Sequence, residues 1–258
     1  MQKEDIKFEN STVLEGMTSL RALFAAQKAG VNDRKVLRLL YAASREEKLY
    51  KELSFLRAMG HEQGFPVLAA SDDEISALSV GSSHGGLLAE CGVRTLQPLR
   101  EVQTIPKKGF YAMIQGIEDP YNFGYAIRSL YACGVDGIVL SERNWLSAAG
   151  VVARSSAGAS EMLPVYVAEP TEAADLFHEH HYTVVCADER TDHLLHKTVL
   201  KKPILLIVGG ERRGISRALL EKADLLVKIG YGREFKASLS AASATTMLAY
   251  EIFKQNCE

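Results

Sequence analysis

The most constraining feature of this sequence is an alternation of short apolar runs with helical patterns, which fills its second half. Strands are expected at Tyr111–Gln115 and Gly137–Leu140. Further short apolar runs lie at Leu163–Val167, Thr183–Ala187, Ile204–Val208 and Leu225–Ile229. Helices are expected at Gly124–Cys133, Ala148–Ser155 and about Ala241–Phe253. Strands that alternate with helices predict an α/β fold with a mostly parallel sheet, covered by helices on both faces.

The N-terminal part of the chain shows a smaller set of elements. We expect a strand at Lys35–Tyr41, a helix at Arg45–Met59 and a second strand at Phe65–Ala69. The acidic run Asp72–Glu74 then favours the start of a short helix, because acidic side chains stabilise a helix N-terminus. These elements predict a compact α/β unit.

A polar stretch with proline and glycine joins the two parts between Arg94 and Phe110. We place the boundary near Thr104, which gives domains 1–103 and 104–258. The chain has 258 residues, of which 47% are hydrophobic, and this is enough for two domains with their own cores.

Charge and cysteine content limit the classes of function. The formal net charge is −2, so RNA binding would depend on local basic surface. No apolar run approaches the roughly 18 residues of a membrane span, and the N-terminus is polar. The four cysteines are scattered without a C-x-x-C pair, which is typical of reduced thiols. We expect a cytoplasmic protein that does not enter a membrane.

Asp119–Arg128 is the first of three turns that could carry chemistry. Pro120 and Gly124 fit a strand-to-helix turn in which Asn122 is a good N-cap. Arg128 falls within the apolar pattern of the same helix, where a guanidinium is costly unless it meets an anion. Both a simple capped helix and a ligand site fit this pattern.

The second turn, Gly209–Gly214, follows the apolar run Ile204–Val208. Glycines at the carboxyl end of a parallel strand let a ligand approach the backbone. The spacing is similar to that of a phosphate loop, but Ile215-Ser216 replaces the required Lys-Ser/Thr, so a nucleotide triphosphatase is not expected.

The third turn, Val227–Gly232, is followed by a run of small residues at Ala237–Ala244. Such a run permits tight packing of backbones. It also leaves backbone amides and carbonyls accessible to a ligand.

In this order and spacing, the three turns resemble motifs of the SpoU, or TrmH, branch of the SPOUT RNA methyltransferases. The matching positions are Asn122, Gly124 and Arg128 in the first motif, Gly209, Glu211 and Gly214 in the second, and Ile229, Ser238 and Leu239 in the third. The segment Arg154–Glu161 resembles a Ser-x-Gly-Ala segment of the family. Two departures are Gly230 at the proline position and Ser240 at an asparagine position, with one extra residue between Ile229 and Leu239.

The resemblance implies a fold with two special features. The catalytic domain would contain a deep C-terminal trefoil knot, and residues before Thr104 would form a small RNA-binding domain akin to a ribosomal protein. The resemblance also implies a homodimer in which Arg128 of one subunit faces the cofactor of the other. Its apolar contacts are expected from the helices that hold Ile127, Leu130, Met247, Leu248, Tyr250 and Ile252.

The activity implied is the S-adenosyl-L-methionine-dependent methylation of a ribose 2′-hydroxyl in rRNA or tRNA, without a metal. Main-chain groups of Gly209, Ile229 and Leu239 would bind the cofactor. The catalytic set would be Arg128, Asn122, Glu211, Ser238 and Ser240. A guanidinium holds its proton too strongly to be a good base, so we expect Arg128 to stabilise the developing alkoxide electrostatically.

Several alternatives stay open at this stage. The changes at Gly230 and Ser240 allow a non-catalytic RNA-binding protein, other SPOUT branches methylate bases, and Glu211 could simply cap a helix. Six basic residues of the first domain could face RNA or only solvent: Lys35, Arg38, Arg45, Lys48, Lys51 and Arg57. The histidines of 178–181 lack the Cys or Asp spacing of a metal site, so no metal is expected.

Overall fold

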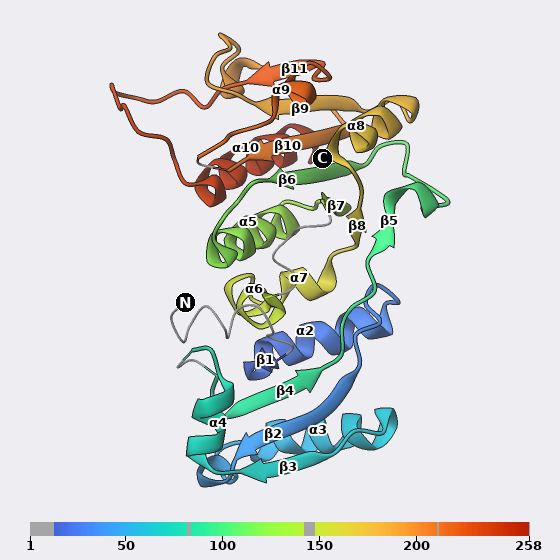
Figure 1. Ribbon diagram of the computed structural model, residues 1–258, viewed down its shortest axis with the longest axis vertical. Coiled ribbons are helices and arrows are strands. Elements are labelled where there is room, and N and C mark those ends of the chain that lie inside the picture. The colour runs from blue at the N-terminus through green and yellow to red at the C-terminus, as the bar shows by residue number, and fades with distance from the viewer. Residues whose placement is uncertain (1–12, 82–83, 142–147, 211, 258) are drawn as a thin grey trace. The chain divides into compact units, whose positions relative to one another are not determined.

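The computed structural model of this chain describes residues 13–81, 84–141, 148–210 and 212–257. These residues form two compact units (Figure 1). The first unit holds the described residues of Met1–Thr95 and Trp145–Met162, and the second holds those of Leu96–Asn144 and Leu163–Glu258. The units differ from the expected domains 1–103 and 104–258 in two respects. The first unit ends nearer residue 95, and a segment from the middle of the chain belongs to it.

A four-stranded sheet with strand order β1-β4-β2-β3 forms the first unit. Its elements are β1 (Val13–Glu15), α2 (Gly16–Lys28), β2 (Val36–Ala42), η1 (Ala43–Arg45), α3 (Tyr50–Gln63), β3 (Val67–Ala70), α4 (Asp72–Leu78) and β4 (Leu87–Cys91). β4 runs antiparallel to β1 and β2, and β3 is parallel to β2. The predicted elements are present, but α3 begins after the η1 turn and not at Arg45. α4 begins with a capping box made by Ser71 and Glu74, in agreement with its acidic first turn.

Two short helices from the middle of the chain complete this unit, namely α6 (Ala149–Ser155) and α7 (Ala159–Met162). α6 packs on β1 and α7 packs on α2. Gly158 between them has φ +85°, and a Cβ atom there would lie 2.4 Å from the Cβ atom of Ala22. The Ser-x-Gly-Ala segment therefore needs a glycine both for its backbone conformation and for its close approach to α2.

A buried ion pair explains why this segment belongs to the first unit. The Arg34 and Glu161 side chains are 4% and 1% exposed, and their Nε and Oε2 atoms are 3.0 Å apart. Asn32 Nδ2 donates to the same Glu161 oxygen at 2.7 Å. Removing one partner of such a pair leaves a buried charge uncompensated, which costs about 3–5 kcal/mol. The pair joins positions that are 127 residues apart in sequence.

The second unit contains a seven-stranded sheet with order β11-β9-β10-β6-β7-β8-β5. Its strands are β5 (Gln97–Pro98), β6 (Phe110–Gln115), β7 (Gly137–Leu140), β8 (Val165–Val167), β9 (Thr183–Ala187), β10 (Ile204–Gly209) and β11 (Leu225–Val227). Its helices are η2 (Leu99–Glu101), α5 (Pro120–Ala132), α8 (Pro170–Glu179), η4 (Leu195–Lys197), α9 (Arg217–Leu220) and α10 (Ala241–Asn256). Every strand pairing in the sheet is parallel. The predicted parallel α/β fold is confirmed.

Helices cover both faces of this sheet. On one face Phe177 of α8 is fully buried, with its ring centroid 5.0 Å from those of both Tyr111 and Tyr182. α5 and α10 pack against each other, and α10 also contacts β10 (Figure 1). Side chains alternate between the two faces of a strand, so the strand residues that point away from α8 point toward α5 and α10. The carboxyl ends of β9, β10 and β11 lie side by side in this sheet.

Two kinds of feature are absent from the described residues. No described helix combines the length and apolar character that crossing a lipid bilayer requires. Within the same residues, no group of three or more His, Cys, Asp or Glu side chains is placed to hold a metal ion. His178 instead lies 3.0 Å from the Asp224 carboxylate.

Candidate functional site

A cavity of about 760 Å³, which we call the glycine cavity, opens where β9, β10 and β11 end. Gly209, Ile229 and Leu239 all line it, as does Ser238. The structure therefore brings together the three expected cofactor-binding positions from two separate motifs. Ligands of open parallel sheets bind at this edge, so the position fits a small-molecule site.

The loop after β10 is shaped by glycines that have no room for a side chain. A Cβ atom on Gly209 would lie 2.4 Å from the Gly214 carbonyl carbon, and one on Gly210 would lie 1.8 Å from the Gly116 oxygen. The Gly210 amide donates to the Gln115 carbonyl at 2.7 Å, and the Gly214 amide donates to the Gly210 carbonyl at 3.0 Å. This hydrogen-bonded loop presents backbone to the cavity.

The third motif forms the opposite side of the glycine cavity. The Leu239 amide donates to the Tyr231 hydroxyl at 3.3 Å, which ties the two ends of the connecting loop together. Ser238 is exposed. Ser240 is the N-cap of α10, because its Oγ atom accepts the Ser243 amide at 3.2 Å. The side chain of Ser240 therefore has a structural role in addition to any catalytic one.

The first motif differs from its predicted geometry in two ways. α5 begins at Pro120, and its N-cap is Asp119, whose carboxylate accepts the Asn122 amide at 2.9 Å. The prediction that Asn122 caps the helix is wrong, because proline suits the first helical position and the preceding Asp supplies the acceptor. Asn122 lies in the first turn and is half-buried.

Arg128 lies on the exposed side of α5. The expectation that it falls within the apolar face is wrong, because the buried face is formed by Phe123, Ala126, Ile127 and Leu130. Among the described residues Arg128 has no hydrogen-bond or ion-pair partner. Asn122, Arg128 and Ser240 are not among the described residues that line the glycine cavity, and Glu211 lies outside the described residues.

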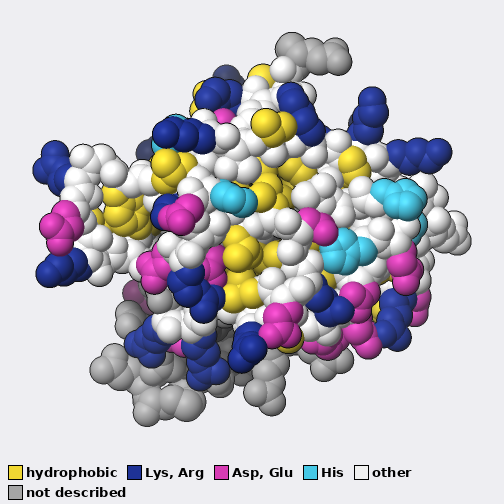
Figure 2. Space-filling view, turned by 90° about the horizontal axis from the view of Figure 1, so that it is seen from above, with side chains coloured by type: hydrophobic (Ala, Val, Ile, Leu, Met, Phe, Trp, Pro, Cys, Tyr) yellow, Lys and Arg dark blue, Asp and Glu magenta, His cyan; other side chains and the backbone are white. Residues whose placement is uncertain are grey.

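Basic side chains dominate the rim of the glycine cavity. Its charged lining residues are Arg190, Arg212, Arg213, Arg217, Lys228, Asp188 and Glu189. The Arg190 guanidinium hydrogen-bonds the Asp188 carboxylate and lowers its pKa, so that this acid stays ionised. Figure 2, which views the molecule from above, shows Lys and Arg side chains projecting around the outline of the visible face. The Arg212-Arg213 pair within the second motif was the sequence feature that could have revealed this rim.

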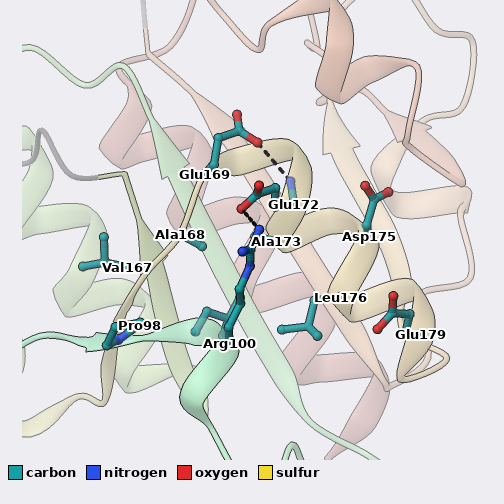
Figure 3. A pocket seen from close by; sticks show the side chains of 11 residues that line it. Pro98, Arg100, Val167, Ala168, Glu169, Glu172, Ala173, Asp175, Leu176 and Glu179 are labelled. Carbon is teal, nitrogen blue, oxygen red and sulfur yellow. Dashed lines mark hydrogen bonds and ion pairs between the residues drawn. The ribbon is translucent and has the colours of Figure 1, made fainter.

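The second unit has another depression, of about 660 Å³, which we call the acidic groove (Figure 3). Its apolar floor includes Leu99 and Leu176, and its acidic side chains are Glu169, Glu172, Asp175 and Glu179. Arg100 pairs with Glu172, and Glu169 caps α8 by accepting the Thr171 and Glu172 amides. None of the motif positions lines this groove.

Two sequence relatives of this chain are assigned to the same protein family. The chain is 32% identical over 146 residues to a Staphylococcus haemolyticus protein assigned to the TrmH family of tRNA/rRNA methyltransferases. That alignment covers 55% of this chain and 57% of the relative, so it spans little more than half of either protein. A Bacillus subtilis protein with the same assignment is 25% identical over 229 residues, which cover 87% of this chain and 90% of that one.

Solved structures share the fold. A crystal structure described as an RNA 2′-O ribose methyltransferase has a TM-score of 0.75 at 22% identity and covers 95% of this chain and 89% of its own. An rRNA methyltransferase from Sinorhizobium meliloti, solved with S-adenosylmethionine bound, has a TM-score of 0.78 at 22% identity, with coverages of 95% and 88%. These similarities confirm the α/β fold class.

The sequence model of the SpoU rRNA methylase family matches residues 109–250. This segment contains all three motifs, both sides of the glycine cavity, and more than half of the chain. It confirms the resemblance read from the motifs. The chain therefore belongs to the SpoU rRNA methylase family.

Proposed function

We propose that this chain is an S-adenosyl-L-methionine-dependent RNA methyltransferase that methylates a ribose 2′-hydroxyl of rRNA or tRNA in the cytoplasm. The observation that carries the proposal is the convergence of Gly209, Ile229 and Leu239 on one cavity within the segment that matches the family. The structural relatives named for 2′-O methylation or solved with the cofactor support it.

The glycine cavity fits the cofactor chemically. Ile215, Leu220 and Leu239 give it apolar surface that suits an adenine ring. The glycine turns leave amides and carbonyls accessible for the polar edges of the ligand. When bound, the cofactor supplies an electrophilic methyl group on a sulfonium. The main chain at Gly209, Ile229 and Leu239 would hold and orient it, while the surrounding loops exclude water.

Arg128 would act on the RNA. A guanidinium offers only hydrogen-bond donors, so it would be a poor base but a good electrostatic partner for a developing alkoxide and the adjacent phosphate. The lack of an internal partner among the described residues leaves its fork of donors available for this role. Asn122, Glu211, Ser238 and Ser240 would position the reacting groups around it.

We also propose a homodimer formed through α5 and α10. The residues first expected at the interface divide into two groups. Ile127, Leu130, Leu248 and Ile252 are fully buried within the fold, where α5 and α10 pack together. Met247 and Tyr250 are exposed and remain available to a partner. Three further exposed aromatic side chains on the same two helices were not expected at the interface, namely Tyr125, Tyr131 and Phe253.

The position of Arg128 fits this dimer. It lies three residues from both Tyr125 and Tyr131, and therefore on the same exposed stripe of α5. A second subunit that covers this stripe would bring Arg128 close to its own surface. The arrangement would supply the glycine cavity of the partner with Arg128, which does not line the cavity of its own chain.

We also propose a C-terminal knot in the second unit and an RNA-binding surface on the first unit. After β11 the chain returns from the sheet edge to α10, which packs on β10 and α5, and this return supports a C-terminal segment threaded through the preceding loop. In the first unit Arg38 and Arg57 are paired with Glu90 and Glu46. The four other basic residues, Lys35, Arg45, Lys48 and Lys51, are exposed and would contact RNA.

Mapping the methyl group tests this proposal. RNA from cells that lack the protein is incubated with the full chain and isotope-labelled cofactor, digested with nucleases and analysed by mass spectrometry. We expect the label on a ribose 2′-oxygen. A label on a base would instead identify a base methyltransferase, and bound RNA without any transfer would identify a non-catalytic RNA-binding protein.

A further inference from the structure

An exposed aromatic pair lies on the loop between β11 and α10. Tyr231 and Phe235 are 44% and 54% exposed, and their rings meet edge to face with centroids 5.8 Å apart. This loop is drawn in orange to red in Figure 1, where it extends away from the sheet before it reaches α10. The loop thus exposes a large aromatic surface beside the proposed active site.

The aromatic pair is anchored to the glycine cavity. Tyr231 is itself one of the cavity-lining residues. Its hydroxyl accepts the amide of Leu239, which lines the cavity as well. Because Phe235 packs against this ring, it lies beside a residue that lines the glycine cavity.

Basic residues flank Phe235 on both sides. Arg233 and Lys236 are exposed, and neither has an ion-pair partner among the residues that the structure describes. Glu234 is the single acid between them. An exposed aromatic face between cations matches the chemistry of single-stranded RNA, whose bases stack on rings while its phosphates bind basic side chains.

We propose that Phe235 is a stacking platform for a base of the RNA substrate, next to the ribose that is methylated. The proposal rests on the proposed function of the glycine cavity and names how the substrate is held there. A ribose 2′-hydroxyl can reach a recessed methyl donor only if its nucleotide leaves the stack of its neighbours. The Phe235 ring replaces the stacking that is lost, and Arg233 and Lys236 bind the flanking phosphates.

Two substitutions separate stacking from simple apolar contact. Phe235→Leu keeps an apolar side chain without an aromatic face, whereas Phe235→Trp keeps the face. For a mixed-sequence single-stranded oligoribonucleotide, we expect the leucine variant to raise Kd about tenfold and the tryptophan variant to stay near the wild type. Cofactor affinity and oligomeric state should be unchanged in both. Equal Kd values for the wild type and the leucine variant would overturn the proposal.

A fluorescence measurement tests the contact directly and does not depend on catalysis. The chain has one tryptophan, so the wild type gives the background signal. Phe235→Trp should be quenched when the oligoribonucleotide is added. The control is Val199→Trp at a position that is 73% exposed and does not line the cavity, where we expect no quenching.

The outcomes distinguish this inference from the proposed function. Quenching at position 235 without methyl transfer by the wild type would support the platform and refute the enzyme. Methyl transfer without quenching would retain the enzyme and refute the platform. A leucine variant whose main defect is loss of the dimer would show that Phe235 contacts a second subunit and not RNA.

Discussion

The glycine cavity and the acidic groove belong to the same unit and have similar volumes, about 760 and 660 Å³. Their linings differ completely. The glycine cavity is built from backbone at strand ends, and its rim is mainly basic. The acidic groove is lined by α8 together with residues 98–100 and 167–169, and its Glu169 and Glu172 are already engaged in a helix cap and an ion pair. Volume therefore does not identify the site, whereas accessible backbone and the sign of the charge do.

The largest expected effect is on the rate of methyl transfer, and it distinguishes Arg128 from Arg100 of the acidic groove. Arg128→Ala should lower the single-turnover rate of methyl transfer by about 10²- to 10³-fold, because the charge that stabilises the alkoxide is lost. Arg128→Lys should fail as well, since an ammonium cannot reproduce the planar fork. Cofactor affinity and melting temperature should hardly change. Arg100→Ala in the acidic groove is the control and should retain the wild-type rate, and full activity of Arg128→Ala would break the proposed mechanism.

The next effect concerns the backbone of the glycine cavity. Gly210→Ala would place a Cβ atom 1.8 Å from the Gly116 carbonyl oxygen, so the loop must shift. We expect the cofactor Kd, measured by calorimetry, to rise at least about tenfold, or about 1.4 kcal/mol. Gly232→Ala is the matched control, because nothing lies within 4 Å of a Cβ atom there. Equal affinities of the two variants would show that the loop after β10 does not hold the cofactor.

A smaller effect is expected at the basic rim. Arg213 lines the glycine cavity and has no ion-pair partner among the described residues. If it binds a phosphate, Arg213→Ala should weaken RNA binding about equally for all sequences and reduce the salt-dependence slope by about one. Glu179→Ala in the acidic groove should leave that slope unchanged. Binding measured over a series of salt concentrations decides between these results.

The smallest effect is expected at Ser240. Asparagine caps a helix about as well as serine, so Ser240→Asn should preserve the cap on α10 and change cofactor affinity only slightly. Ser240→Ala should cost about 1 kcal/mol of stability, because the Ser243 amide loses its acceptor. Thermal denaturation and calorimetry on both variants measure this difference. A large loss of affinity in the asparagine variant would mean that the serine contacts the ligand through its side chain.

Local patterns predicted the parts of the fold that depend on neighbouring residues. Apolar runs and glycines predict the strands from β6 to β11 and the turns at Gly209 and Ile229, but not β5, which lies in the stretch expected to join the two domains. The side of α5 that Arg128 occupies was misread, because residues adjacent in sequence to buried positions can point away from them on a helix. α8 was not predicted, although Glu169 and Pro170 provide a helix start.

Long-range partners could not be predicted in the same way. Nothing near Glu161 in the sequence indicates that its partner is Arg34, and this pair places α7 in the first unit. The basic rim was also missed, because its arginines come from the loops after β9 and β10, which only the fold brings together. The sequence therefore predicted the backbone positions that line the glycine cavity but not its basic rim.

Hydrogen–deuterium exchange with and without S-adenosylmethionine tests the central claim most directly, because it reports on both depressions in one experiment. The account predicts slower amide exchange at 208–217 and 227–240, around the glycine cavity, and no change at 97–101 and 167–179, around the acidic groove. Unchanged exchange around the glycine cavity at saturating cofactor, or protection confined to the acidic groove, would contradict it.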